Sequence, residues 1–244
     1  IIEALVYREL KTRVSEVRFG LVGVFIEPVG IIAVFLIIFS LIRGYREDID
    51  IALFLATGII LFTLFNDIAI RSINAMKANE ALFYYKTIKP IDTVIARTIV
   101  EMGLYAIVYI IVISFIYILK EKITLDDFPI LVITYLLLSL NAFAIGLILM
   151  ISGHRYPWIA QIVPLLMRPL WFISGVFFSL QQIPPRIVPF ISWNPILQAV
   201  EISRNALSIN YVLINQNLEN CYQQIEKIIL LNKEKFIKPS QTIQ

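Results

Sequence analysis

The sequence predicts an all-α fold, a polytopic bundle of transmembrane helices. Of its 244 residues, 59% are hydrophobic and 16% are charged, and the mean hydropathy is +0.80. A soluble domain carries about 25% charged residues. Because a hydrocarbon layer of about 30 Å takes about 20 residues of helix, five apolar runs are long enough to cross it: 21–42, 51–70, 99–119, 128–151 and 158–180. These runs are continuous and do not alternate, which favours helices over a β-barrel.

The first twenty residues are predicted to form an amphipathic interface helix. Apolar residues recur there at spacings of three and four, and basic residues, including Arg8, Arg13 and Arg18, lie on the other side. Such a helix lies in the membrane interface with its basic face toward headgroups or an acidic partner. A surface anchor and a partner-docking role are both open. The chain begins with Ile1, so we expect the true N-terminus upstream, and no cleavable signal peptide is visible.

The distribution of Lys and Arg predicts the orientation of the chain. Segment 1–20 carries four basic residues and segment 71–98 carries five, whereas 43–50 and 120–127 carry two each, accompanied by acidic residues. The positive-inside rule therefore places the N-terminus and 71–98 in the cytoplasm. The net charge of +3 is small and indicates orientation in a membrane, not binding of nucleic acid.

The segment between the second and third spans is long for a connection inside a compact bundle. It is predicted to form a short helix from Ser72 to about Tyr85 that ends before Pro90. Phe83, Tyr84 and Tyr85 lie at its end among lysines. An aromatic and basic knob of this kind suits the docking of a cytosolic subunit. Anchoring in the membrane interface is the alternative.

Ionisable residues inside spans are expensive and indicate function by default, but several here have an ordinary explanation. Two pairs at span ends are predicted to interact along their own helices: Asp67 with Arg71, and Arg97 with Glu101. Glu27 lies near the start of the first span, where its side chain can reach the interface. Asn141, in the middle of the fourth span, is predicted to hydrogen-bond to another helix.

Arg168 has no such explanation, because it lies near the middle of the fifth span. Pro164 and Pro169 flank it, and the carbonyls that prolines free are tolerated where a helix faces protein or a water-filled cavity. We expect Arg168 to face that cavity together with the aromatic residues that follow it: Trp171, Phe172, Phe177 and Phe178. Aromatic faces beside a polar path suit a sugar polymer. The alternative is that these aromatics face lipid or the protein core.

Four motifs in order carry a family resemblance: "LVGVFIEP" with Glu27, "SINAMKANEAL", "RPLWFISGVFF", and "WNP" followed by Glu201 and Arg204. Together they resemble the ABC-2 type permeases that export capsular polysaccharide, including the polysialic acid type, or lipopolysaccharide O-antigen. Permeases for wall teichoic acid are similar. The resemblance covers about residues 8–208, and each motif is weak alone.

The resemblance implies a permease subunit without enzymatic activity. Such permeases work as homodimers with a separate cytosolic ATP-binding cassette subunit, and the chain contains no GxxxxGK[ST] phosphate loop. ATP and Mg²⁺ are thus expected on the partner, and this chain is expected to hold no cofactor of its own. A single cysteine, Cys221, and a single histidine, His154, exclude a cysteine-based metal cluster and a disulfide framework.

The resemblance also assigns roles to the residues singled out above. Residues 1–20 form the interface helix, with Arg8, Arg13, Arg18 and Glu27 at the interface. The helix around 72–85 couples to the ATPase, through Asn79, Glu80, Phe83, Tyr84 and Tyr85. The substrate canal is lined by Arg168, Trp171, Phe172, Phe177 and Phe178. Re-entrant helices over 184–208 form a gate region that contains Trp193, Asn194, Pro195, Glu201 and Arg204.

Two features of the gate region follow from the residues themselves. Asn194 is a good N-cap and Pro195 fits the first position of a helix. Glu201 and Arg204 are three residues apart and can pair at a depth where a single charge would be too costly.

The tail, 209–244, departs from the family, which has a sixth span that returns the C-terminus to the cytoplasm. The tail is polar, and its longest apolar run is four residues. Either 196–214 crosses the membrane or the last span is lost.

The sequence thus predicts a multi-pass permease of a bacterial inner membrane that exports a polysaccharide and contacts membrane lipids, not nucleic acid. The rivals are an ABC-2 permease for drugs or lipids, and a membrane scaffold or defective relic that transports nothing.

Overall fold

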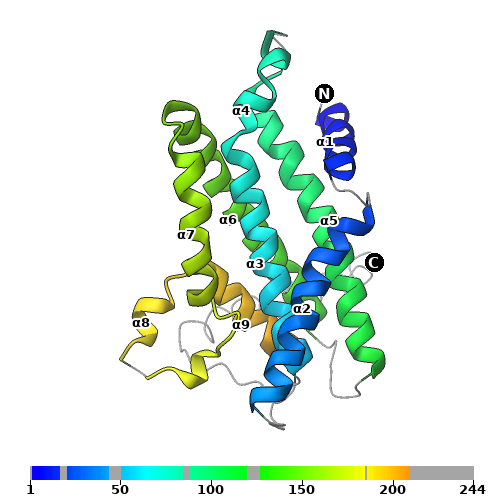
Figure 1. Cartoon of the computed structure of the whole chain (residues 1–244), viewed down its shortest axis with the longest axis vertical. Helices are drawn as coiled ribbons and strands as arrows, with labels where there is room; N and C mark the ends of the chain where they lie inside the picture. Colours follow the sequence, from blue (N-terminus) through cyan, green and yellow to red (C-terminus); the bar gives the residue numbers. More distant parts are fainter. Residues whose placement is uncertain are drawn as a thin grey trace, which may run out of the picture.

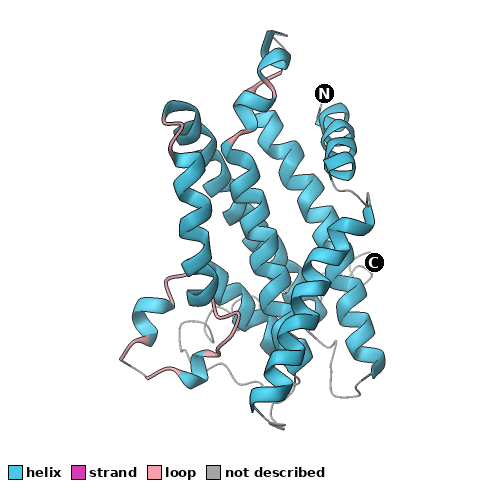
Figure 2. Cartoon of the chain, in the orientation of Figure 1, coloured by secondary structure: helices cyan, strands magenta, loops and turns pink. Residues whose placement is uncertain are grey.

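In the computed structural model, the chain is a helical bundle whose long helices run roughly along one axis (Figures 1 and 2). The structure describes residues 2–16, 21–43, 51–84, 88–119, 127–184 and 186–208. Within these ranges there is no β-strand. The prediction of an all-α fold is confirmed.

The long helices are α2 (Leu21–Arg43), α3 (Ile51–Ile73), α5 (Pro90–Leu119) and α6 (Phe128–Arg155). The shorter helices are α1 (Ile2–Glu16), α4 (Ala75–Ala78), η1 (Glu80–Tyr84), α7 (Ile159–Ile173), η2 (Leu180–Gln182), α8 (Val188–Ile191) and α9 (Pro195–Leu207). By length and composition, α3, α5 and α6 can each cross a membrane, and two shorter apolar helical stretches lie at Phe25–Phe39 and Ile159–Ile173. All five apolar runs predicted from the sequence are therefore helical over most of their length.

Helix α5 begins well before the predicted start of the third span. The apolar run starts at Ile99, but the helix starts at Pro90, a residue whose missing N–H costs nothing at a first helical position. Asp92 supports this start, because its Oδ2 accepts a hydrogen bond from the Lys89 N–H at 2.9 Å. Apolar runs mark the part of a helix that lies in hydrocarbon, and capping residues mark where the helix begins.

Two other elements differ in length from their predictions. The fifth apolar run reaches Leu180, but α7 ends at Ile173 and the chain turns at Gly175, whose φ is +73°. Glycine adopts this left-handed conformation without steric cost. The predicted helix over 72–85 is divided among the end of α3, α4 and η1, and Tyr85 lies outside the described residues.

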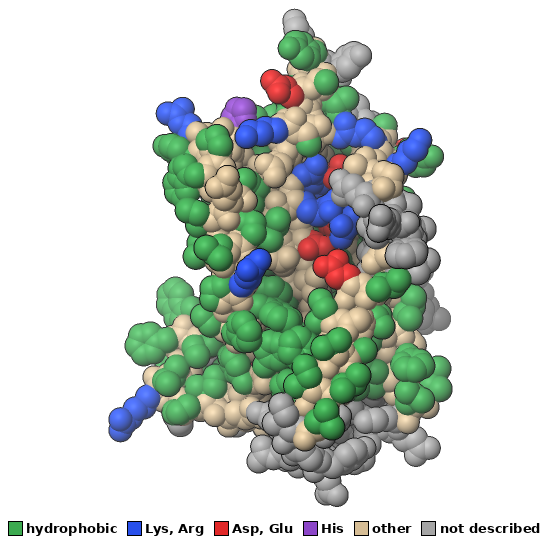
Figure 3. All heavy atoms as spheres, viewed as in Figure 1, with side chains coloured by type: hydrophobic (Ala, Val, Ile, Leu, Met, Phe, Trp, Pro, Cys, Tyr) green, Lys and Arg blue, Asp and Glu red, His purple; other side chains and the backbone are tan. Residues whose placement is uncertain are grey.

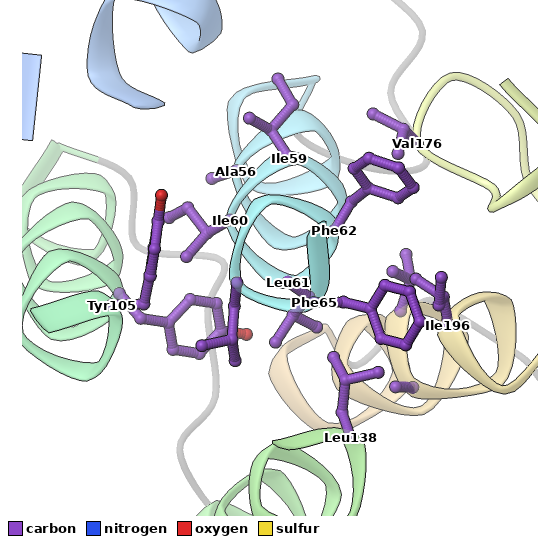
Figure 4. Packing of buried hydrophobic residues seen from close by; sticks show 14 of the residues in the cluster. Ala56, Ile59, Ile60, Leu61, Phe62, Phe65, Tyr105, Leu138, Val176 and Ile196 are labelled. Atoms are coloured by element: carbon purple, nitrogen blue, oxygen red, sulfur yellow. The ribbon is translucent and has the colours of Figure 1, made fainter. Parts of the chain in front are cut away.

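Helix α3 is the central helix of the bundle, and 17 of its 23 residues are buried. It packs against α2, α5, α6, α7 and α9. Figure 4 shows its side chains Ile60, Phe62 and Phe65 pointing toward different neighbouring elements. Because one helix is covered on several sides, α2, α7 and α9, which carry predicted site residues, are each positioned by direct packing on α3.

The two ends of the bundle differ. Helix α4, the N-terminal end of α1 and the α6–α7 connection lie at one end, whereas η2 and α8 lie toward the other (Figure 1). The predicted coupling and interface elements thus share an end, and the predicted gate region lies away from them.

Candidate functional site

A cluster of ion pairs joins the N-terminal helix to two of the long helices. The guanidinium of Arg13 on α1 lies 2.9 Å from Asp67 Oδ2 on α3 and 3.3 Å from Glu101 Oε1 on α5. Arg71 of α3 contacts the same oxygen of Glu101 at 3.0 Å. Figure 3 shows basic and acidic side chains gathered in the strip between α3 and α1. We call the residues in these contacts, together with Glu9, Arg97 and Tyr105, the α1 cluster.

The remaining members of the α1 cluster extend it in both directions. Arg97 of α5 lies 2.7 Å from Glu9 Oε1 on α1, and it donates a hydrogen bond to the Arg71 carbonyl. The Tyr105 hydroxyl donates to Asp67 Oδ2 at 2.8 Å. Glu9 is itself largely buried, so each charge of this cluster that lies in the apolar bundle has a close partner of opposite sign.

The sequence predicted local pairs along α3 and α5, and these four side chains instead find partners on other helices. Asp67 contacts Arg13, Arg71 contacts Glu101, and Arg97 contacts Glu9. An exposed pair four residues apart gains only about 0.3–0.5 kcal/mol, whereas a charge pair that lies away from water interacts more strongly. The prediction considered only pairs within α3 or within α5. It did not include α1, which supplies two of the partners, Arg13 and Glu9.

Arg13 remains charged in this setting. Burial on its own would lower the pKa of the guanidinium, but the nearby carboxylates of Glu101 and Asp67 raise it, and the net pKa lies above its ordinary value. Arg13 therefore acts as a fixed positive charge that joins α1 to α3 and α5.

A second link joins α1 to the segment predicted to couple to an ATPase. Arg8 donates a hydrogen bond to Asn79 Oδ1, and Asn79 in turn donates from Nδ2 to the Ala75 carbonyl at 2.8 Å. Asn79 is buried, whereas Glu80 and Tyr84 beside it are exposed. The structure thus brings part of the predicted interface helix and part of the predicted coupling segment together.

Two other predicted residues of these two groups, Phe83 and Glu27, take no part in that link. Phe83 is half-buried in η1, and Glu27 on α2 is exposed. Arg18, like Tyr85, lies outside the described residues.

Helix α9 carries the second buried charge pair. Arg204 Nη1 lies 3.3 Å from Glu201 Oε1, and both side chains are almost completely buried. The prediction that these two residues pair is confirmed. The Arg204 guanidinium also lies 3.5 Å from the centre of the Phe54 ring, where its charge is attracted to the π face.

Most of the hydrogen bonds that Arg204 donates go to backbone carbonyls. It donates from Nη2 to Gly175 at 2.7 Å and to Phe54 at 3.1 Å, and from Nη1 to Phe178 at 3.2 Å. The Gly175 and Phe178 carbonyls belong to the irregular segment after α7. Arg204 therefore satisfies backbone groups that no helix satisfies, which is a requirement for irregular chain at membrane depth.

Asn194 fixes the start of α9. Its Oδ1 accepts a hydrogen bond from the Ile196 N–H at 3.0 Å, and Pro195 occupies the first turn. The predicted N-cap is confirmed. Asn194 also donates from Nδ2 to Ser174 Oγ at 3.0 Å, which ties this cap to the end of α7. Trp193, the residue before the cap, is 88% exposed.

The predicted canal residues are divided between a packed cluster and the surface. Trp171 and Phe177 pack with Phe35 of α2, with ring centres 4.7–5.6 Å apart. Phe172 contacts Trp171 and Phe177 but is 59% exposed, and Arg168 is exposed. Phe178 is half-buried and supplies a carbonyl to Arg204. Trp171 and Phe177 thus pack against the hydrophobic core, while Arg168 and Phe172 face outward from α7.

Residues that sequence reasoning missed include Gly58 and Tyr105. A Cβ on Gly58 would lie 3.0 Å from Arg204 Nη2, so this glycine makes room for the guanidinium. The signals were weak, since a glycine or a tyrosine inside an apolar run is common. Within the described residues no group of three or more His, Cys, Asp and Glu could hold a metal ion, and His154 is exposed.

Comparisons with known proteins agree with this architecture. A family model described as ABC-2 type transporter matches residues 2–207. The chain is 37% identical to the polysialic acid transport protein KpsM of Escherichia coli, over 86% of this chain and 82% of that protein. It is 24% identical to the capsule polysaccharide export inner-membrane protein BexB of Haemophilus influenzae, over 84% and 78% of the two chains. It is 23% identical to the capsule polysaccharide export inner-membrane protein CtrC of Neisseria meningitidis serogroup B, over 84% and 77%.

Proposed function

This chain belongs to the ABC-2 type transporter family, and from that premise we propose that it is the membrane-spanning subunit of an exporter of capsular polysaccharide. The observation that carries the proposal is the likeness, over more than four-fifths of this chain, to inner-membrane proteins named for polysialic acid transport and capsule polysaccharide export. The subunit is a permease and not an enzyme, as the sequence predicted. ATP hydrolysis takes place on a separate partner subunit.

The partner subunit docks, in this proposal, on the end of the bundle that carries α4 and η1. Tyr84 is 87% exposed there and Glu80 is exposed beside it. Asn79 connects this segment to Arg8 of α1, and the α1 cluster connects α1 to α3 and α5. A displacement of η1 by the ATPase is thereby passed to two membrane helices through side chains that are already in contact.

The polymer passes, in this proposal, along the outward side of α7. Arg168 and Phe172 are exposed on that helix, which contains no buried residue. An unpaired helix face of this kind is covered when two copies of the chain assemble as a homodimer, so that the canal lies between them. Phe172 offers a flat face for a sugar ring and Arg168 offers a positive charge for an acidic polymer.

The proposed orientation places the N-terminus, η1 and the α6–α7 connection in the cytoplasm of a bacterium with an inner membrane. Single cysteines at Lys77 and at Arg186, introduced after replacing Cys221, test it with a membrane-impermeant maleimide. Position 186 should label in cells with a permeabilised outer membrane, and position 77 only after lysis. Labelling of both positions from outside would contradict the orientation.

Complementation tests the substrate. An Escherichia coli strain that lacks its polysialic acid transport protein, but keeps the partner ATPase, should regain surface polymer when it expresses this chain. Phe172→Ala should reduce the surface polymer several-fold, whereas Phe115→Ala, an equally exposed phenylalanine on α5, should not. The experiment would be repeated in strains with several capsule types. If the wild-type chain accumulated normally but restored surface polymer in none of them, capsular polysaccharide would be rejected as the substrate class.

Docking of the ATPase is tested by co-purification. Tyr84→Ala should lower the amount of ATPase recovered with the chain. Tyr156→Ala is the matched control, because Tyr156 is also exposed and lies in the α6–α7 connection at the same end of the bundle. Equal recovery with both variants would move the docking surface away from η1.

A further inference from the structure

A cavity of about 410 Å³ lies between α6 and α9, and it borders the predicted gate region at Pro195. None of its lining residues is charged. Leu138, Ala199 and Ile202 are among its apolar walls, and its polar side chains are Thr134, Asn141 and Gln198. Ligand sites in proteins have volumes of about 300–1,000 Å³ and combine apolar walls with few polar groups. The cavity has this composition.

Two of the polar groups in the cavity lack partners among the described residues. Thr134 is 3% exposed, and neither its Oγ1 nor Asn141 Oδ1 takes part in a hydrogen bond there. Other buried threonines in the bundle differ from Thr134, because Thr63 and Thr98 donate to carbonyls of the preceding turn at 2.6 and 2.9 Å. A buried polar atom without a partner costs about 1–3 kcal/mol. A ligand that hydrogen-bonds to both atoms would remove this cost.

The cavity is reached from the side of the bundle. Leu137 and Leu140, which line it, are 53% and 63% exposed, as is usual for side chains that face lipid. A second hollow of about 380 Å³ lies on the other side of Leu140, between α5 and α6, and it too has no charged lining residue. Leu140 therefore forms a ridge between two hollows of nearly equal size.

We propose that this face binds an uncharged lipid with a free hydroxyl, which places the hydroxyl on Thr134 and Asn141 and one acyl chain on each side of Leu140. The hydroxyl donates a hydrogen bond to Asn141 Oδ1 and accepts one from the Thr134 hydroxyl. The absence of charged lining residues disfavours a phosphate headgroup, and two hollows divided by a ridge fit a molecule with two apolar branches. The proposal goes beyond polysaccharide export and does not depend on it.

A lipid in the cavity would contact the gate region, because α9 forms one wall of the cavity. Pro195 and Gln198 belong to α9 and line the cavity, and the Gln198 side chain donates to the Ser192 carbonyl at 2.6 Å. A lipid in this place packs between α6 and the helix that carries Glu201 and Arg204. It thereby holds α9 in its described position.

The test compares two lipids that share both acyl chains and differ in the hydroxyl: dioleoylglycerol, which has one, and the dioleate of propane-1,2-diol, which has none. The full chain, purified with its co-purifying subunits, is loaded with each lipid and examined by native mass spectrometry. We expect about fivefold to tenfold more retention of dioleoylglycerol, the factor that one hydrogen bond of this kind contributes. Thr134→Val and Asn141→Leu should each remove most of that preference, and Thr134→Ser should keep it.

Thr63→Val is the matched control, since it makes the same change in a buried helix outside the cavity and should leave the preference intact. Thermal unfolding without added lipid separates binding from misfolding, because Thr134→Val removes an unpaired hydroxyl and should unfold at the wild-type temperature or above. Equal retention of the two lipids, or a preference that survives Thr134→Val and Asn141→Leu, would overturn the proposal. So would a polypeptide that co-purifies only while Thr134 and Asn141 are present. None of these outcomes depends on whether the chain exports polysaccharide.

Discussion

Arg204 on α9 and Arg13 on α1 are both buried arginines of an apolar bundle, and they differ in what surrounds them. Arg204 has one carboxylate, Glu201, on its own helix, and it donates to several backbone carbonyls. Arg13 has two carboxylates, Asp67 and Glu101, on two other helices. Arg204 thus satisfies the carbonyls of an irregular backbone segment. Arg13 instead connects separate helices through contacts between side chains.

This difference indicates that the Arg204 site and the α1 cluster have different roles. Backbone carbonyls cannot change rotamer, so the contacts of Arg204 require one conformation of the segment after α7. Side-chain pairs can re-form after a small displacement, so the α1 cluster can hold α1 against α3 and α5 while the helices move. We infer that the Arg204 site fixes the structure, and that the α1 cluster transmits motion in the proposed exporter.

The largest effect is expected for Arg204→Met. Glu201 would stay buried without the positive charge of Arg204, and the carbonyls of Gly175 and Phe178 would lose the hydrogen bonds that Arg204 donates. Breaking a buried pair in this way costs about 3–5 kcal/mol, so the variant should fail to accumulate in membranes. Quantitative immunoblotting checks this, with exposed Arg155→Ala as the control. A variant with wild-type abundance and thermal stability would contradict the role of Arg204 as an anchor.

Glu101→Gln should have the next largest effect, because Arg13 and Arg71 both contact this carboxylate. We expect a loss of about 2–3 kcal/mol, less than for Arg204, since Arg13 keeps its contact with Asp67 and Arg71 is partly exposed and can recruit water. Thermal unfolding of the detergent-purified chain measures it. Glu3→Gln, an exposed change on α1, should be neutral. If Glu101→Gln were as damaging as Arg204→Met, the α1 cluster would have to be reassigned as a fixed anchor.

Gly58→Ala tests the Arg204 site from the opposite helix. The new Cβ would lie 3.0 Å from Arg204 Nη2 and from the Val176 Cα, and overpacking of this kind costs about 1–3 kcal/mol. Gly103→Ala on α5 is the matched control, because nothing lies within 4 Å of its Cβ and alanine favours helix by up to about 1 kcal/mol. Opposite shifts in unfolding temperature are therefore expected, and a neutral Gly58→Ala would show that the Arg204 site can adapt.

Arg8→Ala should change stability least, by about 0.5–1 kcal/mol, because the Arg8–Asn79 bond is partly exposed. Its expected effect is on function, since it cuts the link between α1 and the segment that carries η1. ATPase activity of the assembled transporter should persist while polymer export falls, and Lys11→Ala should alter neither. Unchanged export in Arg8→Ala would remove this link from the proposed route of transmission.

Several elements could be predicted from the sequence because their signals are local. The N-cap of α9 needs only Asn194 and Pro195 in order, and the Glu201–Arg204 pair needs only a spacing of three on a helix. The five apolar runs needed only length and composition. By contrast, α7 ends earlier than its apolar run, because Gly175 allows a turn and Leu197 of α9 packs closely against that turn.

The sequence by itself determined that the chain is a helical membrane protein, since burial of apolar runs in lipid needs no knowledge of which helix packs on which. The resemblance of its motifs to ABC-2 type permeases, and not the apolar runs, indicated the family. Tertiary structure alone decided the partners of the charges. Asp67, Arg71, Arg97 and Glu101 had neighbours of opposite sign on their own helices, yet they contact residues as much as 88 positions away in sequence, as Glu9 and Arg97 show. In a medium of low polarity a charge takes the nearest opposite charge in space, and distance in space is fixed only when α1 has docked against α3 and α5.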